Sequence, residues 1–200
     1  MNALYSNGKS APSDRQSAGP RDVSEVTEVS PYLDFGSLRV PTFEGLQMRL
    51  DVEEGSNRVV AITLERNGST IQLQAFAAPK SEGIWHEIRA TMAQSIAAQG
   101  GTTEERIGSL GPELLARIPL MDESGNQAGS RAARFVGVDG PKWFLRGVVG
   151  GAAINDPKAA ADIDDIFRSV TVVRGDAPMP PKDLLPLTMP GGTVTPPRVI

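Results

Sequence analysis

The stretch RFVGVDGPKWFLRGVVGG, which runs from Arg134 to Gly151, places a chain reversal between two runs of mostly apolar residues. Apolar residues recur at every second position in both runs, which is typical of β-strands. A two-residue turn at Asp139-Gly140 would require Pro141 to donate the closing hydrogen bond, and proline has no N–H. We therefore expect a β-hairpin with a four-residue turn at the centre of the protein.

The two faces of this hairpin follow from the predicted turn, which sets Val138 opposite Trp143 and Phe135 opposite Arg146. One face carries a core set of Val136, Val138, Trp143, Leu145 and Val149. The other face is apolar except for one arginine and carries Phe135, Phe144, Arg146 and Val148. We expect a helix to cover this second face, with Arg146 lying across Phe135 and reaching solvent. A ligand-binding role for Arg146 is the alternative.

Further strands are predicted on both sides of the hairpin. Residues 46–79 contain three alternating apolar runs, separated by EEGSN and RNGS. Asn67-Gly68 is typical of a two-residue hairpin turn, because both residues tolerate positive φ. The runs TEERIGSL and ELLARIPLM predict short strands, and SVTVVRG predicts a closing strand. Strands connected in this way form an antiparallel sheet.

Two amphipathic helices accompany these strands. In the first, apolar residues recur at every fourth position from Ile84 to Ile96. We expect Ser81 to cap its start and Gly100-Gly101 to end it. The second helix begins at Asp156-Pro157, where a capping residue precedes a proline suited to the first helical position. The order of elements predicts one α+β domain, with the helices packed on an antiparallel sheet.

The two ends of the chain differ in composition from the middle. Residues 1–30 are rich in Ser, Gly, Pro and charged residues, which predicts a disordered arm. Residues 176–200 are rich in proline, which predicts a flexible, extended tail. The α+β domain is therefore expected at residues 31–175. Within the tail, KDLLPLTMP contains Leu184 and Leu185, which would either dock into a partner or lie back on the domain.

The composition excludes several classes of protein. The net charge is −4 and the basic residues are dispersed, which argues against binding to nucleic acid. No stretch approaches the roughly 18 apolar residues of a membrane helix, so we expect no membrane partner. The first residues lack the apolar segment of a secretory signal, and we expect a cytoplasmic protein. The sequence has no cysteine, which excludes disulfides and thiolate nucleophiles.

Few residues point to catalysis. His86, the single histidine, lies away from the predicted apolar stripe and is expected at the surface. Asp162, Asp164 and Asp165 complement the dipole of the second helix, and they lack the spacing of a calcium loop. Neither the dinucleotide fingerprint nor a Gly-x-Ser-x-Gly motif is present. We expect no metal, no cofactor and no catalytic residue, and we favour a non-enzymatic protein.

Two functions fit these observations. The first is a protein-interaction or accessory module, with partner contacts at Phe135, Phe144, Leu184 and Leu185. An edge strand such as SVTVVR would also allow pairing with a second copy of the chain. The second is a domain that binds a small anionic ligand or phosphate through Lys142, Arg146, Gly150 and Gly151, since backbone amides can hold anions. A bend made by the two glycines is the simpler explanation of that turn.

Three motifs, PYLDFGSLRVP, DGPKWFLRGVVGGAA and IFRSVTVVRG, resemble a family of uncharacterised actinobacterial cytosolic proteins known as a domain of unknown function. The resemblance covers about Asp22 to Gly175 and implies no particular activity, cofactor or catalytic residue. The order of strands and helices is also similar to the PsbP-like α+β fold, whose members act as binding or accessory subunits. That second likeness concerns the fold and implies no specific function.

Overall fold

Seven antiparallel strands form the main sheet of the computed structural model, which describes residues 8–28, 30–191 and 193–194. Their order across the sheet is β4-β5-β6-β10-β9-β8-β7. The strands are β4 Gln47–Val52, β5 Val59–Arg66, β6 Ser69–Ala77, β7 Thr102–Gly108, β8 Gly111–Met121, β9 Gln127–Gly140 and β10 Trp143–Gly151. Asn67 and Gly68 join β5 to β6 with positive φ angles of 51° and 75°, as predicted.

A smaller second sheet has the order β1-β11-β3-β2-β12. Its strands are β1 Arg21–Asp22, β2 Tyr32–Asp34, β3 Leu38–Pro41, β11 Thr171–Val172 and β12 Thr193–Val194. Only the β1–β11 pairing in this sheet is parallel. The predicted closing strand contributes β11, which lies between β1 and β3. The expectation that it forms a sheet edge was therefore wrong, because β1 comes from the N-terminal segment and pairs with it.

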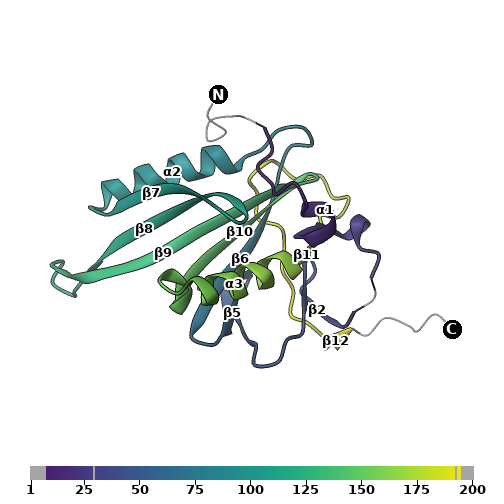
Figure 1. The fold of residues 1–200 in the computed structure, drawn as a ribbon, viewed down its shortest axis with the longest axis horizontal. Helices are drawn as coiled ribbons and strands as arrows, with labels where there is room; N and C mark the ends of the chain where they lie inside the picture. The colour runs from purple at the N-terminus through teal and green to yellow at the C-terminus, as the bar shows by residue number, and fades with distance from the viewer. Residues whose placement is uncertain (1–7, 29, 192, 195–200) are drawn as a thin grey trace.

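The helices lie on opposite faces of the main sheet (Figure 1). Helix α2, Trp85–Ala98, packs on β7, β8 and β9, whereas α3, Pro157–Ser169, and the small sheet cover the other face. The short helices are α1 Arg15–Ala18 and the 3-10 turns η2 Val23–Glu25 and η3 Ala152–Ile154. The predicted α+β class and the single domain with two main helices are confirmed.

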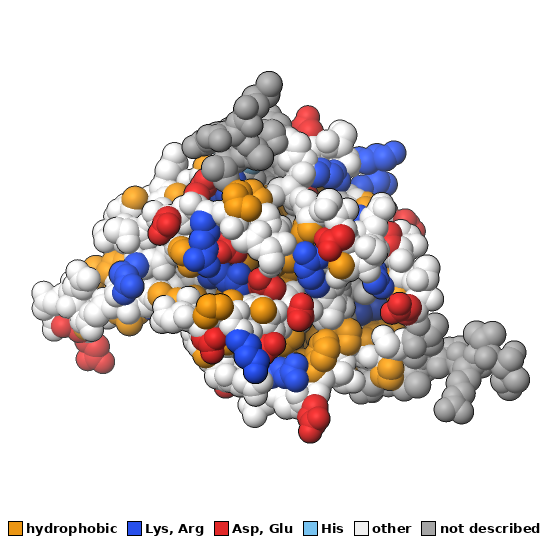
Figure 2. Space-filling view, in the orientation of Figure 1, with side chains coloured by type: hydrophobic (Ala, Val, Ile, Leu, Met, Phe, Trp, Pro, Cys, Tyr) orange, Lys and Arg blue, Asp and Glu red, His pale blue; other side chains and the backbone are white. Residues whose placement is uncertain are grey.

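On the face drawn in Figure 2, basic and acidic side chains are interspersed. Among the described residues, none of the helices has the length and apolar character needed to cross a bilayer.

The turn of the central hairpin differs from the prediction. Trp143 pairs with Gly140 and Leu145 pairs with Val138, so the turn has two residues, Pro141 and Lys142. Pro141 takes the first central position, where no N–H is needed, and Lys142 adopts a φ of 56°. The predicted register was wrong by two residues. Since a shift of two leaves each side chain on its face, the predicted division into two faces holds.

The caps of the two helices come from different places. Asp156 caps α3 as predicted, accepting a hydrogen bond from the Lys158 amide at 2.9 Å. The predicted cap of α2, Ser81, makes no such contact. Instead, the Asp139 carboxylate accepts a hydrogen bond from the Ile84 amide at 3.0 Å, across 55 residues of sequence.

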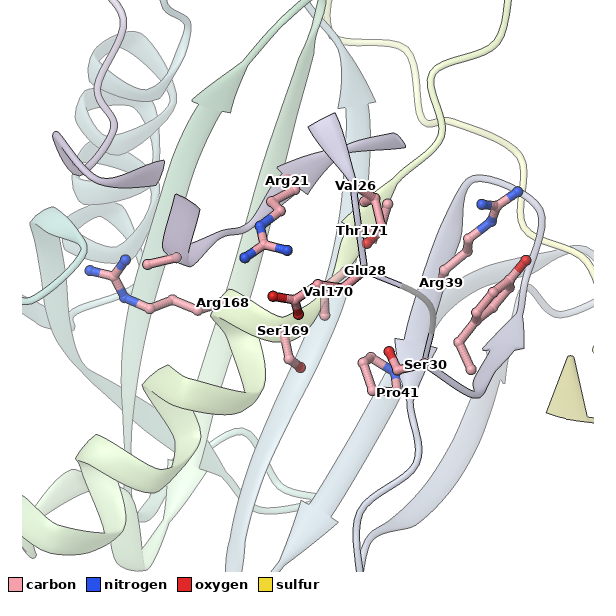
Figure 3. Close-up of a pocket in the computed structure, with 12 residues that line it drawn as sticks. Arg21, Val26, Glu28, Ser30, Arg39, Pro41, Arg168, Ser169, Val170 and Thr171 are labelled. Carbon is pink, nitrogen blue, oxygen red and sulfur yellow. The ribbon is translucent and has the colours of Figure 1, made fainter. Parts of the chain in front are cut away.

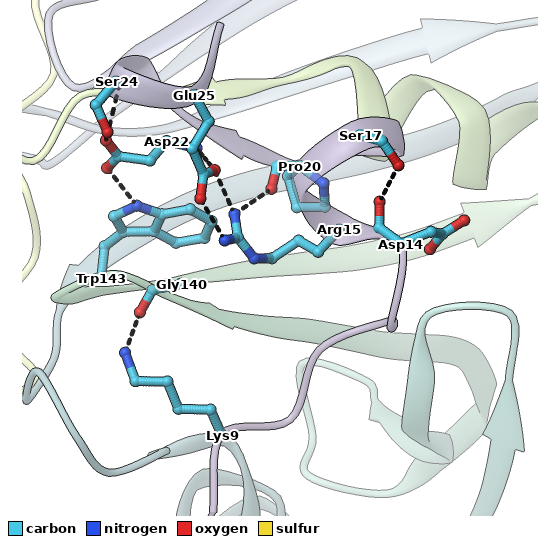
Figure 4. A network of polar contacts seen from close by, with 10 residues as sticks. All are labelled: Lys9, Asp14, Arg15, Ser17, Pro20, Asp22, Ser24, Glu25, Gly140 and Trp143. Carbon is cyan, nitrogen blue, oxygen red and sulfur yellow. Dashed lines mark hydrogen bonds and ion pairs between the residues drawn. The ribbon is translucent and has the colours of Figure 1, made fainter.

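The N-terminal segment packs on the domain from residue 8 onward (Figure 4). Arg15 is buried over the Trp143 ring and makes two hydrogen bonds of 2.6 and 2.7 Å to Glu25. Asp22 accepts a 2.9 Å hydrogen bond from the Trp143 indole. These contacts order the segment, so the domain begins closer to the N-terminus than the predicted boundary at residue 30. Residues 1–7 of the predicted arm lie outside the described residues.

The C-terminal segment also contributes to the interior. Leu185 and Leu187 are 1% and 7% exposed and belong to the main core. The Leu185 amide donates a hydrogen bond to the Ala75 carbonyl at 2.9 Å. This segment therefore pairs with the part of β6 that extends beyond β5. Of the two alternatives for KDLLPLTMP, the structure has the segment lying back on its own domain. The predicted tail thus begins later than residue 176, and residues 192 and 195–200 lie outside the described part of the chain.

Candidate functional site

Arg146 lies on the face of the main sheet that α2 covers only in part. Its neighbours across the sheet are Gln74 in β6 and Gly137 in β9. The guanidinium lies 5.3 Å from the centre of the Phe76 ring, and its Nη2 donates a hydrogen bond to the Gln74 side chain. Its buried Nε has no acceptor among the described residues. The predicted contact with Phe135 was wrong, because the two-residue turn places Val148 opposite Phe135.

The charge of Arg146 has no partner of opposite sign. Within the described ranges, no carboxylate lies at ion-pair distance from its guanidinium. Burial lowers the pKa of Arg146, and no acidic neighbour offsets that effect. A partly buried charge without a counter-ion is unfavourable for the folded state.

A second arginine of the sheet, Arg134, has acidic neighbours that offset the effect of burial. Arg134 in β9 is 3% exposed and lies on the opposite face of the sheet. Its guanidinium contacts Asp164 at 2.6 Å and Glu113 at 3.1 Å. Burial opposes its charge, but hydrogen bonds and attraction from these two carboxylates raise the pKa of Arg134 overall. Arg146 therefore differs from Arg134 in lacking acidic partners.

Polar side chains lie on the same face of the sheet as Arg146, on four neighbouring strands. We call this surface the polar half-face, and its residues are Arg49, Asp51, Thr63, Thr70, Gln72, Gln74 and Arg146. Asp51 accepts hydrogen bonds from Thr63 at 2.5 Å and from Gln72 at 3.1 Å. Burial acts to raise the pKa of Asp51, but these bonds and Arg49 lower it overall. Asp51 is thus an ionised group already engaged with its neighbours.

A cavity of about 300 Å³ lies at one end of the polar half-face. Its lining comprises Arg49, Thr63, Thr70, Gln72, residues 131–133 and residues 148–151. Gly150 and Gly151 form part of its wall, where the chain bends away from the sheet. Gly151 has a φ of 75°, and a Cβ there would lie 2.2 Å from the Gly68 carbonyl oxygen. The bend therefore requires glycine at position 151.

The structure separates the predicted ligand-binding residues into two places. Gly150, Gly151 and Arg146 are on one strand, with Gly150 and Arg146 on the same face. Lys142 lies in the turn at the other end of β10, where its carbonyl accepts hydrogen bonds from Ala78 and Arg174. Lys142 is therefore not part of this site.

The predicted partner-binding residues are mostly inaccessible. Phe144 and Phe135 belong to the core under α2, and Phe144 stacks on Trp85 with ring centres 5.3 Å apart. Leu185 is buried, and Leu184 is half-buried and bridges to Phe76. Helix α2 thus covers this apolar face, as the sequence predicted for the surface around Phe135.

Two other hollows contain arginines that are already engaged. A cavity of about 420 Å³ is lined by Arg21, Arg39 and Arg168 among others (Figure 3). Arg168 donates to Asp14 and to the Gly19 and Ser109 carbonyls, while Arg39 points away from the other two. A wider basin of about 650 Å³ contains the Arg134 network described above. Arg21 has no ion pair among the described residues either, but it donates a hydrogen bond to the Ser17 carbonyl.

Sequence reasoning missed most of this surface. Thr63, Gln72 and Asp51 are ordinary polar residues of strands, and their meeting depends on the register of three strands. The alternation of Thr70, Gln72 and Gln74 with Ile71 and Leu73 in β6 is the signal that could have revealed a polar face.

Three comparisons place the chain among known proteins. A family model with the description "Protein of unknown function (DUF3710)" matches residues 19–195, which confirms the resemblance to a domain of unknown function. No curated protein matches. The solution structure of cyanobacterial PsbP (CyanoP) from Synechocystis sp. PCC 6803 is similar at 10% identity, with a TM-score of 0.42. That match covers 74% of this chain and 94% of the other.

Proposed function

The chain belongs to the family described as "Protein of unknown function (DUF3710)", and we propose that it is a binding module for a small anionic ligand. The polar half-face is the proposed binding site. Arg146 carries this proposal, because it is half-buried and has no carboxylate partner in the described part of the chain. A bound anion would supply the missing charge.

The neighbours of Arg146 define the kind of anion. Phe76 and Gln74 hold the guanidinium in place, and Thr70 offers a hydroxyl group farther along the same face, where Thr63 and Gln72 donate to Asp51. Arg131 adds positive charge at the cavity of about 300 Å³, and Arg49 in the same lining is ion-paired with Asp51. A phosphate or carboxylate that also carries hydroxyl groups fits such a surface.

The test compares two arginine-to-methionine variants. Arg146→Met keeps the aliphatic packing over Phe76 and removes an unpaired charge, so we expect the free protein to be as stable as wild type or about 1 kcal/mol more stable. Arg134→Met removes the buried charge between Glu113 and Asp164, which keep only Arg106 and Ser109 as partners, and should cost about 3 kcal/mol. Urea unfolding of both variants measures the difference. A destabilisation of Arg146→Met as large as that of Arg134→Met would contradict an unpaired, ligand-ready arginine.

Binding is measured by thermal shift with inorganic phosphate, citrate and a sugar phosphate. An anion present at a hundred times its Kd should stabilise wild type by about 2.7 kcal/mol. The same anion should leave the melting temperature of Arg146→Met unchanged. If none of the anions shifts wild type, or if the variant responds equally, the proposal fails.

Protein interaction is a second candidate function, and one observation favours it. The β8–β9 hairpin extends beyond the rest of the sheet and exposes Leu120 and Met121, which are 46% and 59% exposed (Figure 1). A projecting ribbon of this kind is a common contact surface for other chains.

A further inference from the structure

One side of β9 has no strand partner over part of its length. β9 pairs with β8 from Gln127 to Phe135, but it pairs with β10 only from Arg134 to Gly140. Across residues 127–133, no described strand pairs with the side of β9 that faces away from β8. The corresponding part of the hairpin projects from the molecule in Figure 1. This free side of β9 is an accessible sheet edge.

The direction of the backbone groups on this edge follows from the ladder. In an antiparallel strand, the N–H and C=O of one residue point to the same neighbour, and successive residues alternate. Gly140 faces Trp143 of β10 at the closing turn. Residues an even number of positions away therefore point to the same side. Ala132 and Ser130 thus direct their N–H and C=O groups to the free edge.

The opposite edge of the same hairpin is blocked. Gly111 of β8 faces Gly108 of β7 at their turn, so Pro119, eight residues on, also points to the β7 side. The pairing between β7 and β8 reaches only as far as Arg117 of β8, so Pro119 lies on an unpaired stretch of that edge. Proline has no N–H to offer an incoming strand. The hairpin is therefore protected on the β8 side and open on the β9 side.

A positive charge lies beside the open edge. Ala132 and Ala133 line the cavity of about 300 Å³ together with Arg49, Arg131 and Thr70. Arg49 is ion-paired with Asp51 at 3.2 Å, so Arg131 is the lining arginine without an acidic partner among the described residues. Arg131 thus lies beside the unpaired side of β9, just beyond the point where the pairing of β9 with β10 ends. An incoming strand with acidic side chains would match this charge.

We propose that an extended, acidic segment of a partner protein adds to β9 as a further strand along residues 129–133. Backbone hydrogen bonds to Ser130 and Ala132 provide the pairing, and Arg131 selects acidic side chains. The edge shares the cavity of about 300 Å³ with the proposed anion site but does not use Arg146. A variant of Arg146 therefore separates the two proposals.

The test uses a seven-residue acetylated, amidated peptide that alternates valine and glutamate, with the full-length protein labelled with ¹⁵N. Titration should shift the Ser130 and Ala132 amide signals. Replacing glutamate by glutamine should weaken binding about tenfold, a loss of roughly 1.4 kcal/mol. A peptide with N-methylated valines should not bind, because its valines cannot donate backbone hydrogen bonds to β9.

Two charge-reversal variants test the edge itself. Arg131→Glu should abolish binding of the acidic peptide, whereas Arg58→Glu, the same charge change in the exposed turn between β4 and β5, should retain it. Arg146→Met should bind the peptide like wild type, which distinguishes this proposal from the anion site. Equal binding of the glutamine or N-methylated peptide, shifts located elsewhere, or no binding would overturn the proposal. Concentration-dependent shifts of Ser130 and Ala132 without peptide would also overturn it, since a second copy would then be the occupant.

Discussion

At the scale of single residues, the two arginines of the sheet illustrate how context decides the role of a charge. Arg134 lies between Glu113 and Asp164, and its removal would leave Glu113 with only Arg106 and Asp164 with only Ser109 as partners among the described residues. Arg146 lies over the Phe76 ring and has no acidic partner among the described residues. Proteins tolerate such locally unfavourable groups chiefly where they serve a function. The contrast between the two residues is therefore the main support for a binding role.

A pH-dependent prediction follows from Glu25 near the N-terminus. Hydrogen bonds from Arg15 are the main reason that the pKa of Glu25 is lowered in the folded protein. A lowered folded-state pKa gives stability that is present above the unfolded value of about 4.3 and is lost as the pH falls through the folded-state value. Glu25→Gln should therefore cost about 2 kcal/mol at pH 7, with a smaller difference from wild type below pH 4.

Urea unfolding between pH 3 and pH 7 checks this expectation. Glu54→Gln is the control, because Glu54 is exposed and makes no hydrogen bond or ion pair with another described residue. It should follow wild type at every pH. A gap between Glu25→Gln and wild type that stays constant on acidification would show that the ion pair with Arg15 contributes nothing.

At the scale of elements, the start of α2 depends on a residue far away in sequence. The Asp139 carboxylate accepts hydrogen bonds from the backbone amides of Ser10, Ile84 and Trp85. Asp139 therefore fixes the helix start and the N-terminal segment at the same point of the sheet. No local signal in the helix sequence reveals this arrangement.

Replacing Asp139 by alanine should destabilise the protein by about 2–4 kcal/mol, since it removes a helix cap and leaves buried amides unpaired. Ser81→Ala is the matched control at the cap that the sequence suggested, and its effect should lie within about 0.5 kcal/mol. Chemical denaturation of both variants measures the difference. Equal effects of the two substitutions would restore Ser81 as the cap.

The sequence predicted the individual elements better than the turns between them and the neighbours of each strand. Alternation and helical spacing identified the strands of the main sheet and both main helices, because these patterns are local. Of the small sheet, only β11 was predicted. The turn at Pro141-Lys142 was misplaced, since two turn positions were compatible with the missing N–H of proline. The polar half-face could not be predicted, because it depends on which strands are neighbours. β6 lies beside β10, far along the chain, and brings Gln74 next to Arg146.

At the scale of the whole molecule, the terminal segments complete the core. Trp143 has no exposed surface, and residues 14–25 provide both the cation over its ring and the acceptor for its indole. Composition alone suggested that this segment is disordered, since it contains few apolar anchors. Its order comes from polar contacts with the domain, which composition cannot reveal.

Deletion of residues 1–25 should expose Trp143 while the main sheet remains folded. In a Trp85→Phe background, the fluorescence of Trp143 should move to longer wavelengths. In a Trp143→Phe background, the emission of Trp85 should change less, because Trp85, at the start of α2, belongs to a separate apolar cluster. Circular dichroism checks that both truncated proteins retain secondary structure. An unchanged Trp143 spectrum would show that the N-terminal segment does not shield this ring.

The placement of Leu185 and Leu187 has a consequence for synthesis of the protein. Phe35, near the beginning of the domain, receives a backbone hydrogen bond from Thr188, and the Leu187 side chain fills the same core. A nascent chain therefore cannot complete this core until Leu187 and Thr188 have left the ribosome. Until then the incomplete sheet is exposed, which makes it a substrate for chaperones.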